Sequence, residues 1–176
     1  MSAIAIQPAT VRRWPRLRAI VWTLDIAVLL AGLIAFASIP TGAPSPAGVA
    51  PADGRVVVQQ AVAGASALVV ARPETLQLLV AVHKAKGWFG LRVADTAPDG
   101  IAWASTAGAR GVPALSAVFG RATGATVRIR WSDGTETIAT VQSDGTFLAA
   151  RAGVERSVSV AILNVSGGIV RQVAGP

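Results

Sequence analysis

Residues 125–151, ATVRIRWSDGTETIATVQSDGTFLAAR, carry the clearest structural pattern in this chain of 176 residues. Between Val127 and Ser132, apolar side chains alternate with Arg128, Arg130 and a serine. Successive side chains of a β-strand point to opposite faces of the sheet. The alternation therefore predicts a strand with one apolar face and one cationic face.

Two Asp-Gly pairs, Asp133-Gly134 and Asp144-Gly145, follow this strand. Asp-Gly between alternating runs is a strong signal for a β-hairpin, because both central residues can take positive φ. The stretch therefore predicts two successive hairpins that form a three-strand meander. A two-residue second loop would place Val141 opposite Leu148, whereas the register of the first loop stays open between two and three residues.

Short runs of β-branched and aromatic residues, separated by Gly, Pro and Asp-Gly, continue over residues 54–176. No segment there has a 3.6-residue period over three turns, which argues against α-helices. About 120 residues of this kind suit one all-β sandwich. The predicted strands are 55–62, 66–72, 75–83, 88–94, 101–105, 114–120, 125–132, 135–142, 146–151, 157–164 and 168–173.

An apolar run near the start, residues 19–39, contains a single charge, Asp25. About 20 such residues in an α-helix cross a hydrocarbon core of roughly 30 Å. Positive flanks stay in the cytoplasm, and residues 1–18 contain four arginines close to the run, Arg12, Arg13, Arg16 and Arg18. The sequence predicts a single transmembrane helix (signal anchor) over 19–39, with a cytoplasmic N-terminus and an extracytoplasmic domain.

A cleaved signal peptide is the alternative interpretation of the same run. Ala35-Phe36-Ala37 has the A-x-A form of a cleavage site, and residues 26–37 have the length of a signal-peptide core. Cleavage near Ala37 would release the same domain as a secreted protein. The uncleaved anchor is favoured, because signal peptides prefer a shorter core and a polar stretch before the cut.

Residues 40–53, PTGAPSPAGVAPAD, join the predicted anchor to the β-domain over 54–176. Four prolines among small residues predict an extended spacer at about 3.1 Å per residue. Such a spacer would hold the domain away from the membrane.

The run from Gly124 to Ala150 resembles the immunoglobulin-like modules of bacterial surface proteins, where alternating valines, a D-G turn, a threonine-rich strand and a D-G-T-F turn recur. The resemblance implies a Greek-key, immunoglobulin-like sandwich that serves as spacer, adhesin element or ligand-binding head, without shared catalytic residues. The anchor, spacer and domain together also resemble uncharacterised membrane-anchored envelope proteins of high-GC actinobacteria.

Composition excludes several kinds of site. A chain with 52% hydrophobic and 14% charged residues is not intrinsically disordered. The absence of cysteine excludes disulfides, thiolate metal sites and a thiol nucleophile. His83 is the only histidine, and its position suits a solvent-facing strand end. Asp95, Asp99, Asp133 and Asp144 suit turns. We therefore expect no enzyme, no cofactor, and no catalytic or metal-binding residues.

Three residues are candidates for contact with a partner. Asp25 lies within the predicted span, where a carboxylate costs about 2.5–3.5 kcal/mol at the centre and often pairs with another group. Arg128 and Arg130 share a strand face that suits anionic polymers or lipid headgroups, although a solvated face is the simpler interpretation. Trp131 is expected in the core, whereas Trp88 and Trp103 border turns and are candidates for a ligand groove.

The formal net charge of +7 does not predict a nucleic-acid partner, because part of it belongs to the cytoplasmic flank. The expected partners are membrane lipid, with an anionic cell-wall polymer or a membrane protein. The first functional hypothesis is a non-catalytic, membrane-anchored envelope protein whose outer sandwich binds or organises a surface ligand. The alternative is an accessory sensor or regulatory subunit that pairs through its transmembrane helix.

Overall fold

The computed structural model describes residues 42–109 and 111–176. The predicted span 19–39, its basic flank and Asp25 lie outside the described residues. Within the described part, the only helical element is a 3₁₀ turn, η1 (Pro46–Val49). No helix in that part is both long and apolar enough to cross a membrane.

Eleven β-strands make up the rest of the regular structure in the described residues, and all their pairings are antiparallel. Each predicted strand overlaps one of them. The predicted all-β class with sandwich-like packing of antiparallel sheets is thus confirmed. The strands are β1 (Arg55–Val62), β2 (Ala65–Ala71), β3 (Leu76–Lys84), β4 (Gly87–Thr96), β5 (Ile101–Ala107), β6 (Ala114–Arg121), β7 (Thr126–Trp131), β8 (Glu136–Thr140), β9 (Thr146–Ala152), β10 (Ser157–Leu163) and β11 (Ile169–Ala174).

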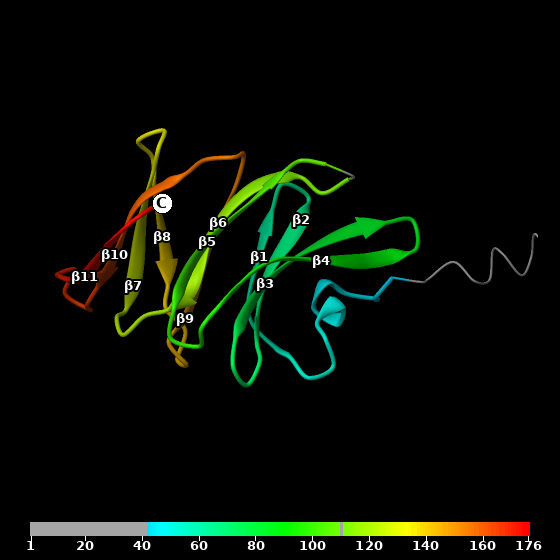
Figure 1. Ribbon diagram of the computed structural model, residues 1–176, viewed down its shortest axis with the longest axis horizontal. Coiled ribbons are helices and arrows are strands. Elements are labelled where there is room, and N and C mark those ends of the chain that lie inside the picture. Colours follow the sequence, from blue (N-terminus) through cyan, green and yellow to red (C-terminus); the bar gives the residue numbers. More distant parts are fainter. Residues whose placement is uncertain (1–41, 110) are drawn as a thin grey trace, which may run out of the picture. The chain divides into compact units, whose positions relative to one another are not determined.

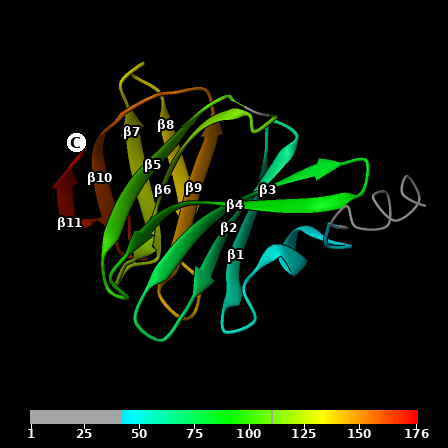
Figure 2. The same ribbon diagram turned by 45° about the vertical axis from the view of Figure 1, so that its right-hand side comes forward.

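The strands form three sheets, which we name A, B and C (Figure 1). Sheet A has the order β1-β2-β3-β4, sheet B the order β5-β6-β9, and sheet C the order β11-β10-β7-β8. Sheet B lies between the other two, as the turned view in Figure 2 also shows. The domain therefore has two face-to-face sheet interfaces, where the sequence predicts one.

Sheet B is buried on both faces. One face packs against sheet A in a core that includes Phe119 and Leu148. The other packs against sheet C in a core that includes Phe147, Ala149 and Trp131. Because neighbouring side chains of a strand point to opposite faces, Phe147 and Leu148 enter different cores. The middle strands therefore need apolar residues at almost every position.

The chain crosses from sheet C to sheet B between β8 and β9, so the predicted three-strand meander is wrong in its third strand. β7 and β8 form the expected hairpin, but β9 pairs with β6. The cause is the continuous apolar run from Phe147 to Ala150, which has no polar face for solvent. The alternating residues of β7, in contrast, suit an outer sheet.

Both Asp-Gly turns are three-residue loops. In the first, the Trp131 N–H donates to the Thr135 carbonyl oxygen (2.9 Å), and Gly134 has a φ of 82°. The second repeats this geometry, with 2.8 Å between the equivalent atoms and a φ of 83° at the glycine. The two-residue register that would place Val141 opposite Leu148 is therefore not formed.

A side chain joins the edges of sheets A and B. The Ala150 N–H in β9 donates to Gln60 Oε1 (2.9 Å), and Gln60 Nε2 donates to the Ala150 carbonyl oxygen (2.8 Å). The amide of Gln60 in β1 thus pairs with β9 as the backbone of a neighbouring strand would. Sheets A and B are consequently held together at an edge as well as across their faces.

Residues 42–53 lie against sheet A, which differs from the extended spacer expected over 40–53. Residues 42–53 belong to the same compact unit as the sheets. Val49 and Ala50 pack on outward-facing apolar residues of β2 and β3, namely Leu68, Val70, Leu79 and Ala81. Those strands are apolar on both faces, so their outer face needs a cover, and burying it favours the docked segment.

Candidate ligand pocket

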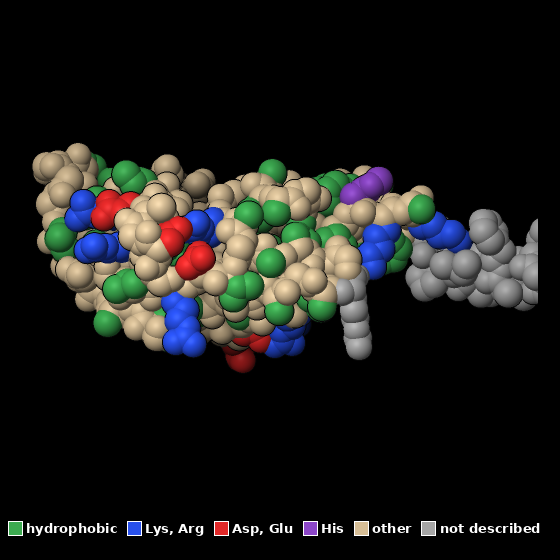
Figure 3. Space-filling view, turned by 90° about the horizontal axis from the view of Figure 1, so that it is seen from above, with side chains coloured by type: hydrophobic (Ala, Val, Ile, Leu, Met, Phe, Trp, Pro, Cys, Tyr) green, Lys and Arg blue, Asp and Glu red, His purple; other side chains and the backbone are tan. Residues whose placement is uncertain are grey.

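Arg128 and Arg130 lie on the outer face of sheet C, as their alternation predicts. Arg130 is exposed opposite Glu136, and Arg128 is half-buried opposite Ile138. Among the described residues neither arginine makes an ion pair. Figure 3 shows side chains of both charge signs intermixed at the end of the unit formed by sheet C. Asp25, the third predicted contact residue, lies outside the described residues.

A pocket of about 420 Å³ lies at one edge of sheets B and C. Its walls include Trp103 from β5, Trp131 from the end of β7, and Ser157 from the start of β10. Glu155 and Arg156, from the connection between β9 and β10, complete the polar lining. Ligand pockets in proteins commonly have volumes of roughly 300–1,000 Å³, so this one suits a small molecule or one unit of a polymer.

Two buried polar atoms in the pocket residues have no hydrogen-bond partner within the described part of the chain: Trp103 Nε1 and Ser157 Oγ. The Ser157 residue is only 3% exposed. Leaving a buried donor or acceptor unpaired costs about 1–3 kcal/mol. An indole nitrogen only donates, and a hydroxyl both donates and accepts, so an oxygen atom is a suitable partner for either of them.

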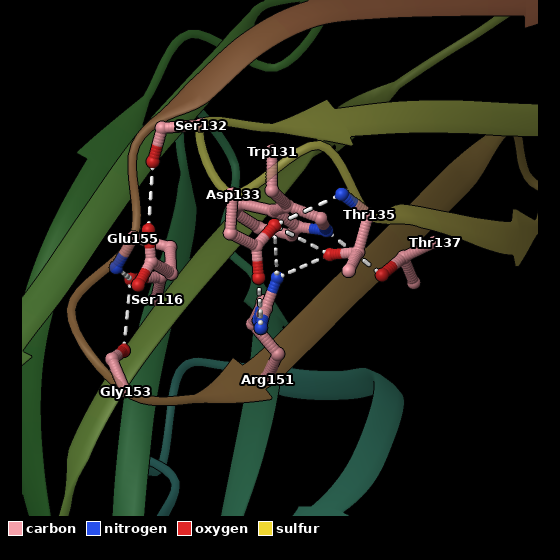
Figure 4. Close-up of polar contacts among 9 residues, drawn as sticks. All are labelled: Ser116, Trp131, Ser132, Asp133, Thr135, Thr137, Arg151, Gly153 and Glu155. Atoms are coloured by element: carbon pink, nitrogen blue, oxygen red, sulfur yellow. Dashed lines mark hydrogen bonds and ion pairs between the residues drawn. The ribbon is translucent and has the colours of Figure 1, made fainter.

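Hydrogen bonds fix the wall of the pocket formed by the connection between β9 and β10 (Figure 4). Ser132 Oγ donates to Glu155 Oε2 (2.7 Å), and the Glu155 N–H donates to Ser116 Oγ (2.7 Å). Ser116 Oγ in turn donates to the Gly153 carbonyl oxygen (3.0 Å). Glu155 is therefore engaged with the protein, whereas the exposed Arg156 supplies a positive charge beside the pocket.

A second network orients Trp131, as Figure 4 shows. Trp131 Nε1 donates to Thr137 Oγ1 (2.8 Å), and the Arg151 guanidinium lies 5.5 Å from the centroid of the indole ring. Arg151 also donates to the Asp133 carboxylate (2.9 Å). These contacts pin the first Asp-Gly turn to β9 and give the pocket a rigid aromatic wall.

The Asp133 carboxylate is expected to make the stability of the fold depend on pH. Hydrogen bonds from Arg151, and then from Thr135, hold the pKa of Asp133 well below its usual value. A carboxyl with a lowered folded-state pKa stabilises the fold above its unfolded pKa of about 4, and this contribution is lost as pH falls below that value. We expect Asp133→Asn to lower the urea midpoint at pH 7 and to reduce its decline on acidification to pH 2.

Asp99→Asn is the matched control, because this exposed aspartate makes no ion pair among the described residues. Asp133→Asn retains some acid dependence from Asp144. Burial, the largest effect, raises the pKa of Asp144, but hydrogen bonds from Thr146 and the charges of Arg121 and Arg55 together lower it. An unchanged acid profile in Asp133→Asn would show that its carboxylate does not stabilise the turn.

The structure distinguishes the three tryptophans of the predicted domain. Trp103 lines the pocket, as one of two predicted groove candidates. Trp88 instead packs on the outer face of sheet A and contacts His83, which is exposed at the end of β3 as expected. Trp131 is buried in the core as predicted, and it also borders the pocket. Ser157 was not predicted, because nothing in the sequence indicates that it lies near Trp103.

No group of three or more potential metal-ligating side chains occurs within residues 42–109 and 111–176. Comparison with known proteins gives no relative: no protein-family model matches the chain, and neither a curated protein nor a solved structure matches it. The pocket and its contacts therefore carry the functional argument.

Proposed function

We propose that the protein is a non-catalytic, single-pass membrane protein of the cell envelope whose extracytoplasmic β-domain binds a surface ligand. The membrane placement rests on the apolar run 19–39 and the arginines before it. Ligand binding rests on one observation, the two unpartnered buried polar atoms of Trp103 and Ser157 in residues that line one pocket.

The proposal includes an immunoglobulin-like class for residues 101–174. Sheet B, with the order β5-β6-β9, faces sheet C, with the order β11-β10-β7-β8. The chain crosses between these sheets after β6, β8 and β9. This order supports a Greek-key sandwich, to which sheet A adds a further layer.

The chemistry of the pocket favours a sugar unit with a negatively charged group, as in an anionic surface polymer. Trp103, which is only partly buried, offers aromatic surface to an apolar ring face. Trp103 Nε1 and Ser157 Oγ need oxygen partners, which sugar hydroxyls supply. Arg156 can pair with a carboxylate or phosphate beside the ring.

Calorimetric titration with oligoglucuronate tests the proposal. The full chain is held in detergent micelles, and the binding affinity is measured. We expect Trp103→Ala and Ser157→Ala each to weaken binding by about fivefold or more, because each loses a buried hydrogen bond worth about 1–3 kcal/mol. Arg156→Gln should weaken oligoglucuronate binding but leave binding of the neutral glucose oligomer unchanged.

The double variant Arg128→Ser, Arg130→Ser is the matched control for charge, since both residues lie on the outer face of sheet C. It should bind oligoglucuronate as the native chain does. If this variant loses binding while Trp103→Ala retains it, the ligand lies on the sheet face and the pocket proposal is rejected. Absence of binding to either oligosaccharide rejects the sugar assignment.

A further inference from the structure

The β3–β4 hairpin ends in a basic and aromatic tip, residues 83–89, with the sequence HKAKGWF. His83, Lys84 and Ala85 are exposed. The His83 ring meets Trp88 edge to face with 5.1 Å between centroids, and Lys84 Nζ lies 5.9 Å from the centroid of the Phe89 ring. The tip thus presents positive charge next to aromatic surface.

The N-terminal segment of the described chain is attached at this tip. The Gly42 N–H donates to the Lys86 carbonyl oxygen (2.8 Å), and Ala43 exchanges two backbone hydrogen bonds with Trp88 (2.8 and 2.9 Å). Gly87 has a φ of 115°, and a Cβ there would lie 2.8 Å from the Ala43 carbonyl oxygen. Glycine at this position is what lets the incoming strand approach so closely.

The attachment point is close in sequence to the predicted membrane span. Only Pro40 and Thr41 separate Gly42 from Ile39, the last residue of the predicted span. Three fully extended residue steps cover about 11 Å. That is close to the Debye length of roughly 8–10 Å at physiological salt, so charges at the tip would lie within the electrostatic field of the membrane surface.

Among the described residues of the tip and of the segments attached to it, the charged side chains are all basic. Neither the tip nor the incoming residues 42–50 contain Asp or Glu, and the adjacent β1–β2 turn at Ala63 and Gly64 is also uncharged. On the face drawn in Figure 3, this end of the unit shows basic and histidine side chains without acidic ones, in contrast to the mixed charges near sheet C.

From these observations we propose that the tip of the β3–β4 hairpin binds anionic lipid headgroups of the membrane that anchors the chain. The inference rests on the proposed membrane anchoring and adds a second, specific contact to it. Lys84 and Lys86 supply the attraction, and the aromatic rings suit the headgroup region, where indoles are stable. Sheets A and C lie at opposite ends of the unit (Figures 1 and 2), so a residue in sheet C is distant from this contact.

A unique cysteine tests this contact, since the chain has none of its own. The full chain carrying Ala85→Cys is labelled with a fluorophore and reconstituted into vesicles of phosphatidylcholine and phosphatidylglycerol that contain headgroup-nitroxide lipid. We expect strong quenching at position 85. A label at Val165→Cys, a 94% exposed position in the β10–β11 turn of sheet C, should be quenched little.

Variants that reverse the charge of the lysines test whether Lys84 and Lys86 cause the quenching at position 85. Lys84→Glu with Lys86→Glu should strongly reduce quenching at position 85, as should neutral vesicles or 0.5 M salt, because each lysine near an anionic surface changes the bound-to-free ratio about fivefold. The same reversal at Arg128 and Arg130, on the outer face of sheet C, should leave the quenching unchanged. Gly87→Ala should reduce it by displacing the incoming strand, with both lysines intact.

Flotation of the vesicles separates the two proposals. If the chain does not float with the vesicles, the membrane anchor is rejected, and the tip contact with it. If the chain floats but position 85 is quenched no more than position 165, the anchor stands and the tip contact is rejected. Equal quenching in the native chain and the lysine double variant rejects the electrostatic contact in the same way.

Discussion

Replacing Phe147 with alanine should lower the free energy of unfolding by about 3–5 kcal/mol, a large part of the roughly 5–15 kcal/mol that stabilises a typical domain. Phe147 is fully buried between sheets B and C. Replacing Phe119, on the other face of the middle sheet, with alanine should lower the free energy of unfolding by a similar amount. Phe119 is equally buried, between sheets A and B.

Each substitution should nevertheless give one transition for the whole unit, because both cores share sheet B. Urea unfolding of the full chain in detergent micelles, followed by circular dichroism and by tryptophan fluorescence, provides the measurement. Ile138→Ala is the control at a 67% exposed position and should change stability by no more than about 0.5 kcal/mol. Two separate transitions in Phe147→Ala would show that the cores fold independently.

Trp131→Ala is expected to have an effect of comparable size, about 3–5 kcal/mol. The residue is 1% exposed, and its indole packs in the core between sheets B and C. The substitution also removes the hydrogen bond to Thr137 and the ring under Arg151. Because Trp131 borders the pocket, oligoglucuronate binding should fall together with stability.

Two milder variants separate packing from hydrogen bonding at Trp131. Thr137→Val leaves the indole in place but removes its acceptor, and should cost about 1–3 kcal/mol because the buried N–H is left unpaired. Trp131→Phe keeps much of the buried area and should cost less than Trp131→Ala. A loss below about 1 kcal/mol for Trp131→Ala would be incompatible with a core role for the indole.

The strands could be predicted from the sequence because their signals are local. Alternation around Arg128 and Arg130 places these arginines on a solvent-facing side, and the structure agrees. The aspartates of both Asp-Gly turns accept hydrogen bonds from N–H groups two residues later, at Thr135 and Thr146 (3.0 Å each), as expected for turn residues.

The assignment of strands to sheets could not be predicted in the same way. A continuous apolar run such as Phe147–Ala150 indicates a strand covered on both faces, but the sequence does not say which layers cover it. The docking of residues 42–53 cannot be predicted from the sequence for a related reason. Their proline-rich composition favours an extended chain, whereas the apolar outer face of β2 and β3 determines where that chain lies.

The pocket was only partly accessible to sequence reasoning. Trp103 is a large aromatic residue beside a turn, which makes it a groove candidate. Ser157 and Arg156 have no local signal, because a serine and an arginine at the start of a strand are ordinary surface residues. They join Trp103 only because β10 lies in the sheet that faces β5 and β6.

The docked segment 42–53 also has a mechanical consequence. Backbone hydrogen bonds hold it at Gly42 and Ala43, and an Asp53–Arg72 ion pair holds its other end. A pulling force applied on the N-terminal side would act on these contacts one after another. The segment should therefore detach from sheet A before any sheet unfolds. Release would free a segment whose extended length is about 40 Å and would expose the apolar outer surface of β2 and β3, so that tension on the chain creates a newly exposed adhesive surface.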